Sequence, residues 1–408
     1  MIWAEEYLTF VAKESGTFTL TIGSAVSRSI LSSISYSTDN GKTWNTTNNV
    51  DSQTVTITTP TINEGDKVLW KGIGTGVSTT INNNNRPSTS SIFSSSGEFN
   101  VEGNIMSLIY DDDFINKKSV QGTYNFALLF YSNNMPNTAK VVSARNMVLP
   151  VSAVSTCCYL RMFQGCPALE EAPLSIDATS INEQGCMSMF YGCINLITTP
   201  ELPATTLATN CYSGIFQGCT SLTTAPELPA TTLASYCYQY MFYGCTNLVN
   251  APVLPATTLT NYCYAYMFQN CTNLTTAPEL SATTLADHCC YSMFSFCTSL
   301  INVPSLSATT LATACYASMF QGCTSLTTAP ELPATTLASN CYNYMFQNCT
   351  NLNYIKAMFT TTPSTTYTQN WVNGVAASGT FVKNSAATWT TTGNNGVPTN
   401  WTVQTASE

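Results

Sequence analysis

Residues 202–227, LPATTLATNCYSGIFQGCTSLTTAPE, decide the fold, because close copies of this stretch recur along the chain every 26 residues. The second cysteine of each copy marks the period, at Cys193, Cys219, Cys245, Cys271, Cys297, Cys323 and Cys349, and Cys166 precedes this series by 27 residues. A fixed period of this length is typical of a solenoid, in which no unit buries its apolar face alone. The pattern favours surface presentation over catalysis.

Within a unit, the residue spacing predicts a short helix followed by a short strand. Leu207, Cys211 and Ile215 are four residues apart, as on one face of a helix, and Gly218 is placed to end that helix in a left-handed conformation. Residues 222–226 favour an extended segment, which its final proline should terminate. Stacked units would pair these strands in a parallel sheet ~4.8 Å apart. The expected fold class is mixed α/β, with a short helix and a short parallel strand in each 26-residue unit.

Two apolar positions recur in every unit and predict the core. One inward ladder would consist of Leu222, Leu248, Leu274, Leu300 and Leu326, and a second of Phe216, Phe242, Phe268, Phe294, Phe320 and Phe346. Most of the 18 cysteines fall on two further ladders eight residues apart. That separation is ~12 Å along a helix, too far for a disulfide within one unit. We expect buried, reduced thiols, with bridges between neighbouring units as the alternative. No cofactor is expected, nor zinc, since the chain has no C-x-x-C pair and one histidine.

Residues 1–100 are expected to form a separate small all-β sandwich. Alternating runs that predict strands occur at residues 7–11, 17–22, 54–58 and 67–70. Residues 37–44, STDNGKTW, resemble the Asp-box of sialidase-type propellers. A propeller would need several copies, so this single copy predicts a hairpin in which Asp39 caps the turn.

The remaining regions flank or contain the repeats. Residues 101–150 are interpreted as a connector and N-terminal cap, in which residues 126–130 and 141–149 form a degenerate first unit. Residues 151–360 would hold the solenoid. Residues 361–408 would form a C-terminal cap, with Trp371, Trp389 and Trp401 sealing the exposed end.

Composition excludes several classes of function. The chain has 408 residues, 9% of them charged, and a net charge of −9. A nucleic-acid partner would need a basic face, so none is expected. No stretch approaches the ~18 consecutive apolar residues of a membrane span, so membrane insertion is not expected. The first residues, MIWAEEYLTF, lack the basic and apolar regions of a secretory signal. This favours a protein made in a host cytoplasm and released by lysis, with a removed leader as the alternative.

The signature of Met241, Phe242, Cys245 and Leu248, with Pro252 four residues after the leucine, resembles the BspA-like leucine-rich repeats. These repeats are known from surface proteins of gut bacteria and from phages that infect them. The resemblance covers roughly residues 140–360. It implies a leucine-rich-repeat solenoid used for adhesion and supplies no catalytic residue. A β domain followed by such repeats looks most like a phage-encoded accessory protein.

Candidate ligand-binding residues lie two positions after the ladder leucine: Thr198, Thr224, Asn250, Thr276, Asn302 and Thr328. A row of hydroxyls and amides suits recognition of a sugar or polar peptide. The alternative is that threonine is simply a good strand former, and ice binding is a remote third interpretation. Glutamate follows the proline in four units, at Glu201, Glu227, Glu279 and Glu331, whereas Val253 and Ser305 interrupt the row. The row predicts a polar edge or a spacing of charges, with a row of metal ligands as a weaker alternative.

Other residues that suggest chemistry are given structural interpretations. Tyrosines at Tyr212, Tyr238, Tyr264, Tyr316 and Tyr342 would line the helix side, where they either shield the thiols or form an interaction strip. His288 precedes Cys289, but adjacent helical residues do not face each other, so a catalytic pair is not expected. Asp111, Asp112 and Asp113 favour a solvated turn over a calcium site.

The sequence therefore predicts a non-enzymatic phage virion accessory protein, fibre-like or decoration-like, located on the virion. Virion proteins would bind its N-terminal domain, and a host surface protein or glycan would bind its repeats. A homo-oligomer is compatible with this arrangement. The alternative is a bacterial cell-surface adhesin of the same repeat family.

Overall fold

The computed structural model describes residues 2–22, 31–50, 54–77, 80–81, 87–89, 92–132 and 139–406. The chain forms two compact units. The first comprises Met1–Ala204 and Gly218–Ser221, and the second comprises Thr205–Gln217 and Leu222–Glu408.

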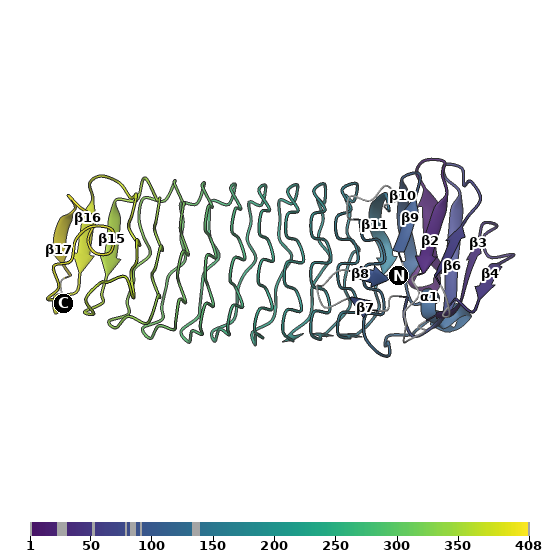
Figure 1. Ribbon diagram of the computed structural model, residues 1–408, viewed down its shortest axis with the longest axis horizontal. Coiled ribbons are helices and arrows are strands. Elements are labelled where there is room, and N and C mark those ends of the chain that lie inside the picture. Colours follow the sequence, from purple (N-terminus) through teal and green to yellow (C-terminus); the bar gives the residue numbers. More distant parts are fainter. Residues whose placement is uncertain are drawn as a thin grey trace. The chain divides into compact units, whose positions relative to one another are not determined.

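Strands of the first unit form a larger and a smaller sheet (Figure 1). The larger sheet has the order β11-β10-β1-β6-β3-β4, with bounds β11 (Val141–Val148), β10 (Phe99–Asn104), β1 (Leu8–Ala12), β6 (Lys67–Gly74), β3 (Leu31–Ser37) and β4 (Asn45–Asn48). The smaller has the order β5 (Val55–Thr58), β2 (Phe18–Ile22), β9 (Ile92–Ser95). The four runs expected as strands are confirmed as β1, β2, β5 and β6. The larger sheet extends past residue 100, because β11 pairs in parallel with β10.

Alternating side chains give these sheets a shared aromatic core. In β2 the residues Phe18, Leu20 and Ile22 are buried, whereas the threonines between them are partly exposed. The ring of Phe10 in β1 lies 5.4 Å from that of Phe18 and 4.8 Å from that of Phe93 in β9. Apolar residues of both sheets thus pack against one another, as the period-two pattern requires.

Short elements complete the first unit. They are η1 (Ile2–Glu5), α1 (Ser107–Tyr110), η2 (Asp111–Phe114), β7 (Thr80–Ile81), β8 (Pro87–Thr89), β12 (Ala153–Val154) and β13 (Ser180–Ile181). Residues 126–130 form a coil that pairs with the next one: the Phe126 N–H donates to Cys158 O at 2.9 Å, and the Phe130 and Phe163 rings stack at 5.0 Å.

The prediction of one helix per unit is wrong, and with it the mixed α/β fold class. Residues 139–406 contain no helix, and the green part of the second unit is drawn as stacked coils without helical ribbons (Figure 1). The structure is almost entirely β, a β-solenoid.

Consecutive turns stand where the helices were expected. In one coil the N–H groups of Tyr236, Tyr240 and Gly244 donate to carbonyls of the next coil at 2.8–3.1 Å. The N–H groups of Tyr238 and Phe242 also donate to the next coil, whereas the residues that alternate with these donors donate to the carbonyl three positions back, as Cys237 does to Ala234 at 3.3 Å. Backbone φ is positive at every fourth residue, 61° at Tyr236, 57° at Tyr240 and 72° at Gly244. A regular α-helix has none of these features, because its N–H groups donate to carbonyls four positions back and its φ is close to −63°.

The error has a physical reason. A spacing of four residues places side chains on one face of a short helix, and a ribbon of four-residue turns does the same. Short isolated helices are marginal in water. The turn ribbon instead gains a backbone hydrogen bond to its neighbour at every second residue. Gly218, expected as a helix C-cap, does have a positive φ of 74°, but as one of these turn positions.

Segments after the ladder leucines pair in parallel, as expected, although mostly as isolated bridges rather than strands. In the second unit Thr224 bridges to Asn250, Thr276 to Asn302 and Thr328 to Tyr354. Regular strands of this unit are β14 (Thr206–Leu207) and the parallel sheet β15 (Tyr354–Ala357), β16 (Thr380–Lys383) and β17 (Thr402–Thr405).

The predicted core ladders are confirmed. The ladder leucines and phenylalanines are buried, with Phe242 and Phe268 stacked at 5.5 Å and Phe268 and Phe294 also at 5.5 Å. All 18 cysteines are buried and free of disulfides. At the C-terminal side, Trp371, Trp389 and Trp401 are buried, and each indole N–H donates to a backbone carbonyl.

Candidate binding surface

The six residues predicted to bind a ligand lie at the surface of their coils. Thr198 in the first unit is half-buried, and its hydroxyl accepts the Ala172 N–H at 3.0 Å. The second unit holds the other five, all exposed: Thr224, Asn250, Thr276, Asn302 and Thr328. Bridges join Thr224 to Asn250 and Thr276 to Asn302, and the Asn302 side-chain amide donates to the Thr276 hydroxyl at 3.1 Å. The five residues of the second unit form the axis of what we call the sheet face.

The sheet face also contains exposed side chains that the sequence interpretation had left out. The position just after each ladder leucine points outward too, so that Val249 is 45% and Ile301 57% exposed. Three residues beyond the polar row, Val253 is 78% exposed. The face is therefore a mixture of hydroxyls, amides and branched aliphatic groups rather than a purely polar row.

Glutamates mark one border of this face. Glu227, Glu279 and Glu331 are exposed. A Glu279 carboxylate oxygen accepts the Ser305 N–H at 3.1 Å, and Glu331 pairs with Lys356 at 2.9 Å. No group of three or more potential metal ligands occurs in the described part of the chain. The glutamates thus lie at the edge of the face as separate carboxylates and do not form a cluster of metal ligands.

Tyrosines divide into two groups on the turn side. The five singled out from sequence, Tyr212, Tyr238, Tyr264, Tyr316 and Tyr342, are all at most 2% exposed, so they belong to the core and not to an interaction strip. A second group is partly exposed and stacked: Tyr236 on Tyr262 at 4.9 Å, and Tyr240 on Tyr266 at 4.6 Å. The sequence pattern does not single out this group, because the equivalent positions of other coils hold Asn210, Ala314 and Asn340.

His288 continues that exposed stack, with its ring 4.5 Å from the ring of Tyr262. Its Nδ1 atom has no hydrogen-bond partner. The neighbouring Cys289 is fully buried, whereas the His288 side chain is partly exposed. A hydrogen bond with the Cys290 thiol lowers the pKa of Cys289, whereas burial raises the pKa of other ladder thiols, from 9.0 to about 12 at Cys193 and Cys297. Thiols held protonated in this way are poor nucleophiles.

Two motifs of the first unit, the Asp-box segment and the acidic run at residues 111–113, make local contacts that have a structural role. In the Asp-box segment the Asp39 carboxylate accepts the Thr43 N–H at 2.9 Å and the Thr43 hydroxyl at 2.6 Å, as a hairpin cap does. These hydrogen bonds lower the Asp39 pKa to about 2. The acidic run is more than a solvated turn: Lys71 pairs with Asp111 at 2.9 Å and with Asp112 at 2.7 Å.

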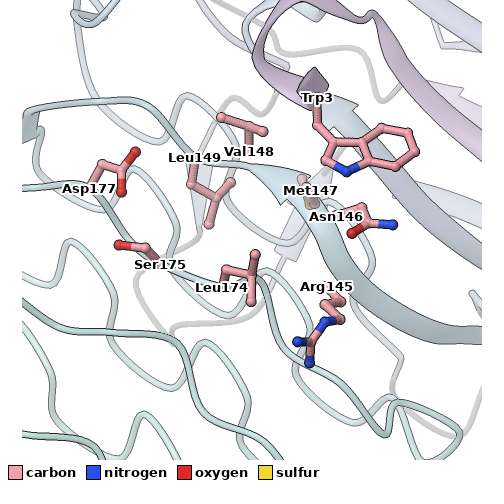
Figure 2. A pocket seen from close by; sticks show the side chains of 9 residues that line it. All are labelled: Trp3, Arg145, Asn146, Met147, Val148, Leu149, Leu174, Ser175 and Asp177. Atoms are coloured by element: carbon pink, nitrogen blue, oxygen red, sulfur yellow. The ribbon is translucent and has the colours of Figure 1, made fainter. Parts of the chain in front are cut away.

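A hollow beside β11 is too small for an organic ligand. Figure 2 shows Leu149 and Leu174 in its middle, with Trp3 and Arg145 to one side. Its volume is about 20 Å³, which is room for one water molecule. Small-molecule pockets are more than ten times larger, at roughly 300 Å³ and above.

Among the described residues, no helix has the length and apolar character needed to cross a membrane.

Comparison with known proteins gives one match. A family model described as the BspA type leucine-rich repeat region matches residues 158–292 and 268–370, in six copies. These ranges together span more than half of the chain. No curated protein and no solved structure matches.

Proposed function

Because the chain belongs to the BspA type leucine-rich repeat family, we propose that it works without catalysis, by attaching its repeats to a host or glycan surface. The observation that carries this proposal is the sheet face. It presents exposed hydroxyl, amide and aliphatic groups in register on successive coils. Such a surface offers many weak contacts to an extended partner and no activated nucleophile or base.

Within that function, our finer proposal is a phage virion accessory protein, with residues 1–100 docking to the particle. The cysteines support it, because 18 buried cysteines without a disulfide suit a protein folded in a reducing cytoplasm. A bacterial surface adhesin of the same family remains the alternative. Alkylation of native protein and, in parallel, of protein unfolded without a reductant, each followed by intact mass measurement, separates the two. We expect no adduct on the native protein and an adduct on every cysteine after unfolding, whereas thiols that stay unmodified after unfolding would be disulfide-bonded and would favour the adhesin.

Charge substitution on the sheet face tests attachment itself. Thr224→Lys, Asn250→Lys and Thr276→Lys together should abolish adsorption to host cells, because three long cations would block the face while the buried ladders remain intact. The matched control places the same charges on exposed threonines of another segment: Thr231→Lys, Thr257→Lys and Thr283→Lys. Equal adsorption by both variants and the wild type would remove the sheet face from the proposal.

A further inference from the structure

The sheet face of the second unit alternates between two kinds of coil. In one kind the residues after the ladder leucine read Thr-Thr-Ala-Pro-Glu, at residues 223–227, 275–279 and 327–331. In the other kind they read Val-Asn-Ala-Pro-Val at residues 249–253 and Ile-Asn-Val-Pro-Ser at residues 301–305. Hydroxyl and carboxylate groups therefore alternate with branched aliphatic and amide groups over five successive coils.

Alternation doubles the repeat distance of the surface. Paired strands lie ~4.8 Å apart, so the surface pattern repeats after about 9.6 Å along the stack. A partner that lies along the stack and uses every coil should share this repeat.

Charge narrows the class of partner. No lysine or arginine occurs between Arg161 and Lys356, whereas Glu227, Glu279 and Glu331 lie along the face. A sulfated, phosphorylated or carboxylated polymer would meet repulsion from Glu227 and Glu279, and the one nearby cation, Lys356, is paired with Glu331. The partner should therefore not be a polyanion, and the two coils without glutamate favour a neutral polymer over a cationic one.

An extended β-1,4-linked glycan meets both conditions. Each pyranose ring is turned over relative to the one before, so that two rings make one repeat, at close to twice the strand spacing. Rings that lie over Val249 and Ile301 would pack their C–H faces on exposed aliphatic groups. The next rings would form hydrogen bonds with threonine hydroxyls and a glutamate carboxylate.

Two coils carry Val253 or Ser305, in place of glutamate, five residues after the ladder leucine. These shorter side chains leave space between the glutamates of the neighbouring coils. A shallow hollow opens beside Ser305, lined by residues 303–307 of that coil and by Pro330, Glu331 and Pro333 of the next. It offers room for a ring substituent at the repeat distance.

An extended peptide fits less well. Side chains of a β-strand repeat after about 6.6 Å, which does not match the face. A polyproline helix repeats after about 9.3 Å, but its recognition relies on aromatic-lined grooves. The alternating positions of these five coils carry no aromatic residue.

We propose that the sheet face of the second unit binds a linear, neutral β-1,4-linked glycan. The glycan would run along the coil stack with one disaccharide for every two coils. The inference rests on the proposed attachment function and names the chemical class of its ligand.

Calorimetry with the full chain tests the ligand class. The probes are cello-oligosaccharides and N-acetylated chito-oligosaccharides of two, four and six sugars. Affinity for at least one series should rise about tenfold or more from two to four sugars, and rise again at six. Sulfated oligosaccharides and a proline-rich peptide should not bind. Binding of either of these, in place of the neutral glycans, would overturn the assignment.

A register variant tests the alternation. Val249→Thr, Asn250→Thr, Val253→Glu, Ile301→Thr, Asn302→Thr and Ser305→Glu convert both aliphatic coils into the other kind. Every new side chain already occurs at the equivalent position of a neighbouring coil, so the fold should persist, as thermal unfolding will check. Affinity should fall at least tenfold. The control alters the turn side of the same two coils, with Tyr236→Asn and His288→Asn, which match Asn210 and Asn340.

The outcomes separate this inference from the proposed function. Equal glycan binding by the register variant and the wild type would refute the role of the alternating coils of the sheet face. If no neutral glycan binds but the triple lysine variant still loses host adsorption, the ligand class is wrong and attachment through this face stands. If the lysine variant also adsorbs normally, both proposals fail.

Discussion

At the scale of single residues, the core depends on rings that stack between coils. Phe268 is fully buried between Phe242 and Phe294. Phe268→Ala should lower the free energy of unfolding by ~3–5 kcal/mol, because it opens a cavity that two neighbouring coils share. Chemical unfolding measures the change. Tyr266→Ala, at a partly exposed position of the same coil, should cost clearly less. Similar losses for both would contradict the ladder as the main source of stability.

Thiols give stability a dependence on pH. Burial raises the pKa of Cys193, Cys297 and Cys349 from 9.0 to about 12. The folded state therefore keeps protons that the unfolded chain loses first. This contribution to stability is complete below pH 9 and is lost as pH rises from 9 toward 12. Unfolding free energies measured from neutral pH to about pH 10 should fall, and Cys297→Ala should reduce the slope. A flat profile would mean that the thiols are exposed or bridged.

Single residues also show how much of the fold can be predicted from the sequence. Burial of Leu222, Phe216 and Cys219 was predictable, because an exact period fixes which positions face inward whatever the backbone does between them. The backbone itself was not predictable from this spacing. Asn210, Gly214 and Gly218 tolerate positive φ and hint at turns, but tyrosine or histidine takes the same conformation in other coils. Their cost is met by tertiary hydrogen bonds that a single sequence does not reveal.

At the scale of elements, the turn ribbon explains where glycine is needed. Gly322 has a φ of 73°, and a Cβ built there would lie 2.5 Å from Cδ1 of Phe296 in the preceding coil. Gly322→Ala should cost more than the ~1–2 kcal/mol of left-handed strain alone, since the ring must also move. Gly393→Ala has the same strain in open space and serves as the control. If Phe296→Gly is added, no ring has to move, so the part of the Gly322→Ala destabilisation beyond the left-handed strain should disappear. Urea unfolding measures this difference.

The candidate surface was predictable only in part, because the short segments after the ladder leucines do not form regular strands. The polar row was predicted because Thr or Asn recurs two positions after each ladder leucine. A strict strand would turn that position inward with the leucine and would leave only the position between them outward. The actual segments pair only through isolated bridges, so both positions are exposed. That geometry places Asn250 and Asn302 on the same face as Val249 and Ile301 and makes the face a two-coil pattern rather than a single row.

At the scale of the whole molecule, the two-coil pattern keeps the last three glutamates of the row apart. Glu227, Glu279 and Glu331 each have a coil without glutamate between them and the next. Because coils of a solenoid contact only their neighbours, whole coils can be removed without losing the fold. Deletion of residues 249–274 removes one coil and brings Glu227 and Glu279 onto adjacent coils. Deletion of residues 249–300 removes two coils and keeps the alternation.

The two deletions should therefore differ in their response to salt. Like charges on adjacent strands destabilise by roughly 0.2–1 kcal/mol, and salt screens exposed charges. The unfolding free energy of the one-coil deletion should rise by about that amount between low and high ionic strength, beyond any rise in the wild type. The two-coil deletion should follow the wild type, although it is the shorter protein. An equal response from both deletions would mean that the glutamates are too far apart to interact, and that the alternation serves the ligand alone.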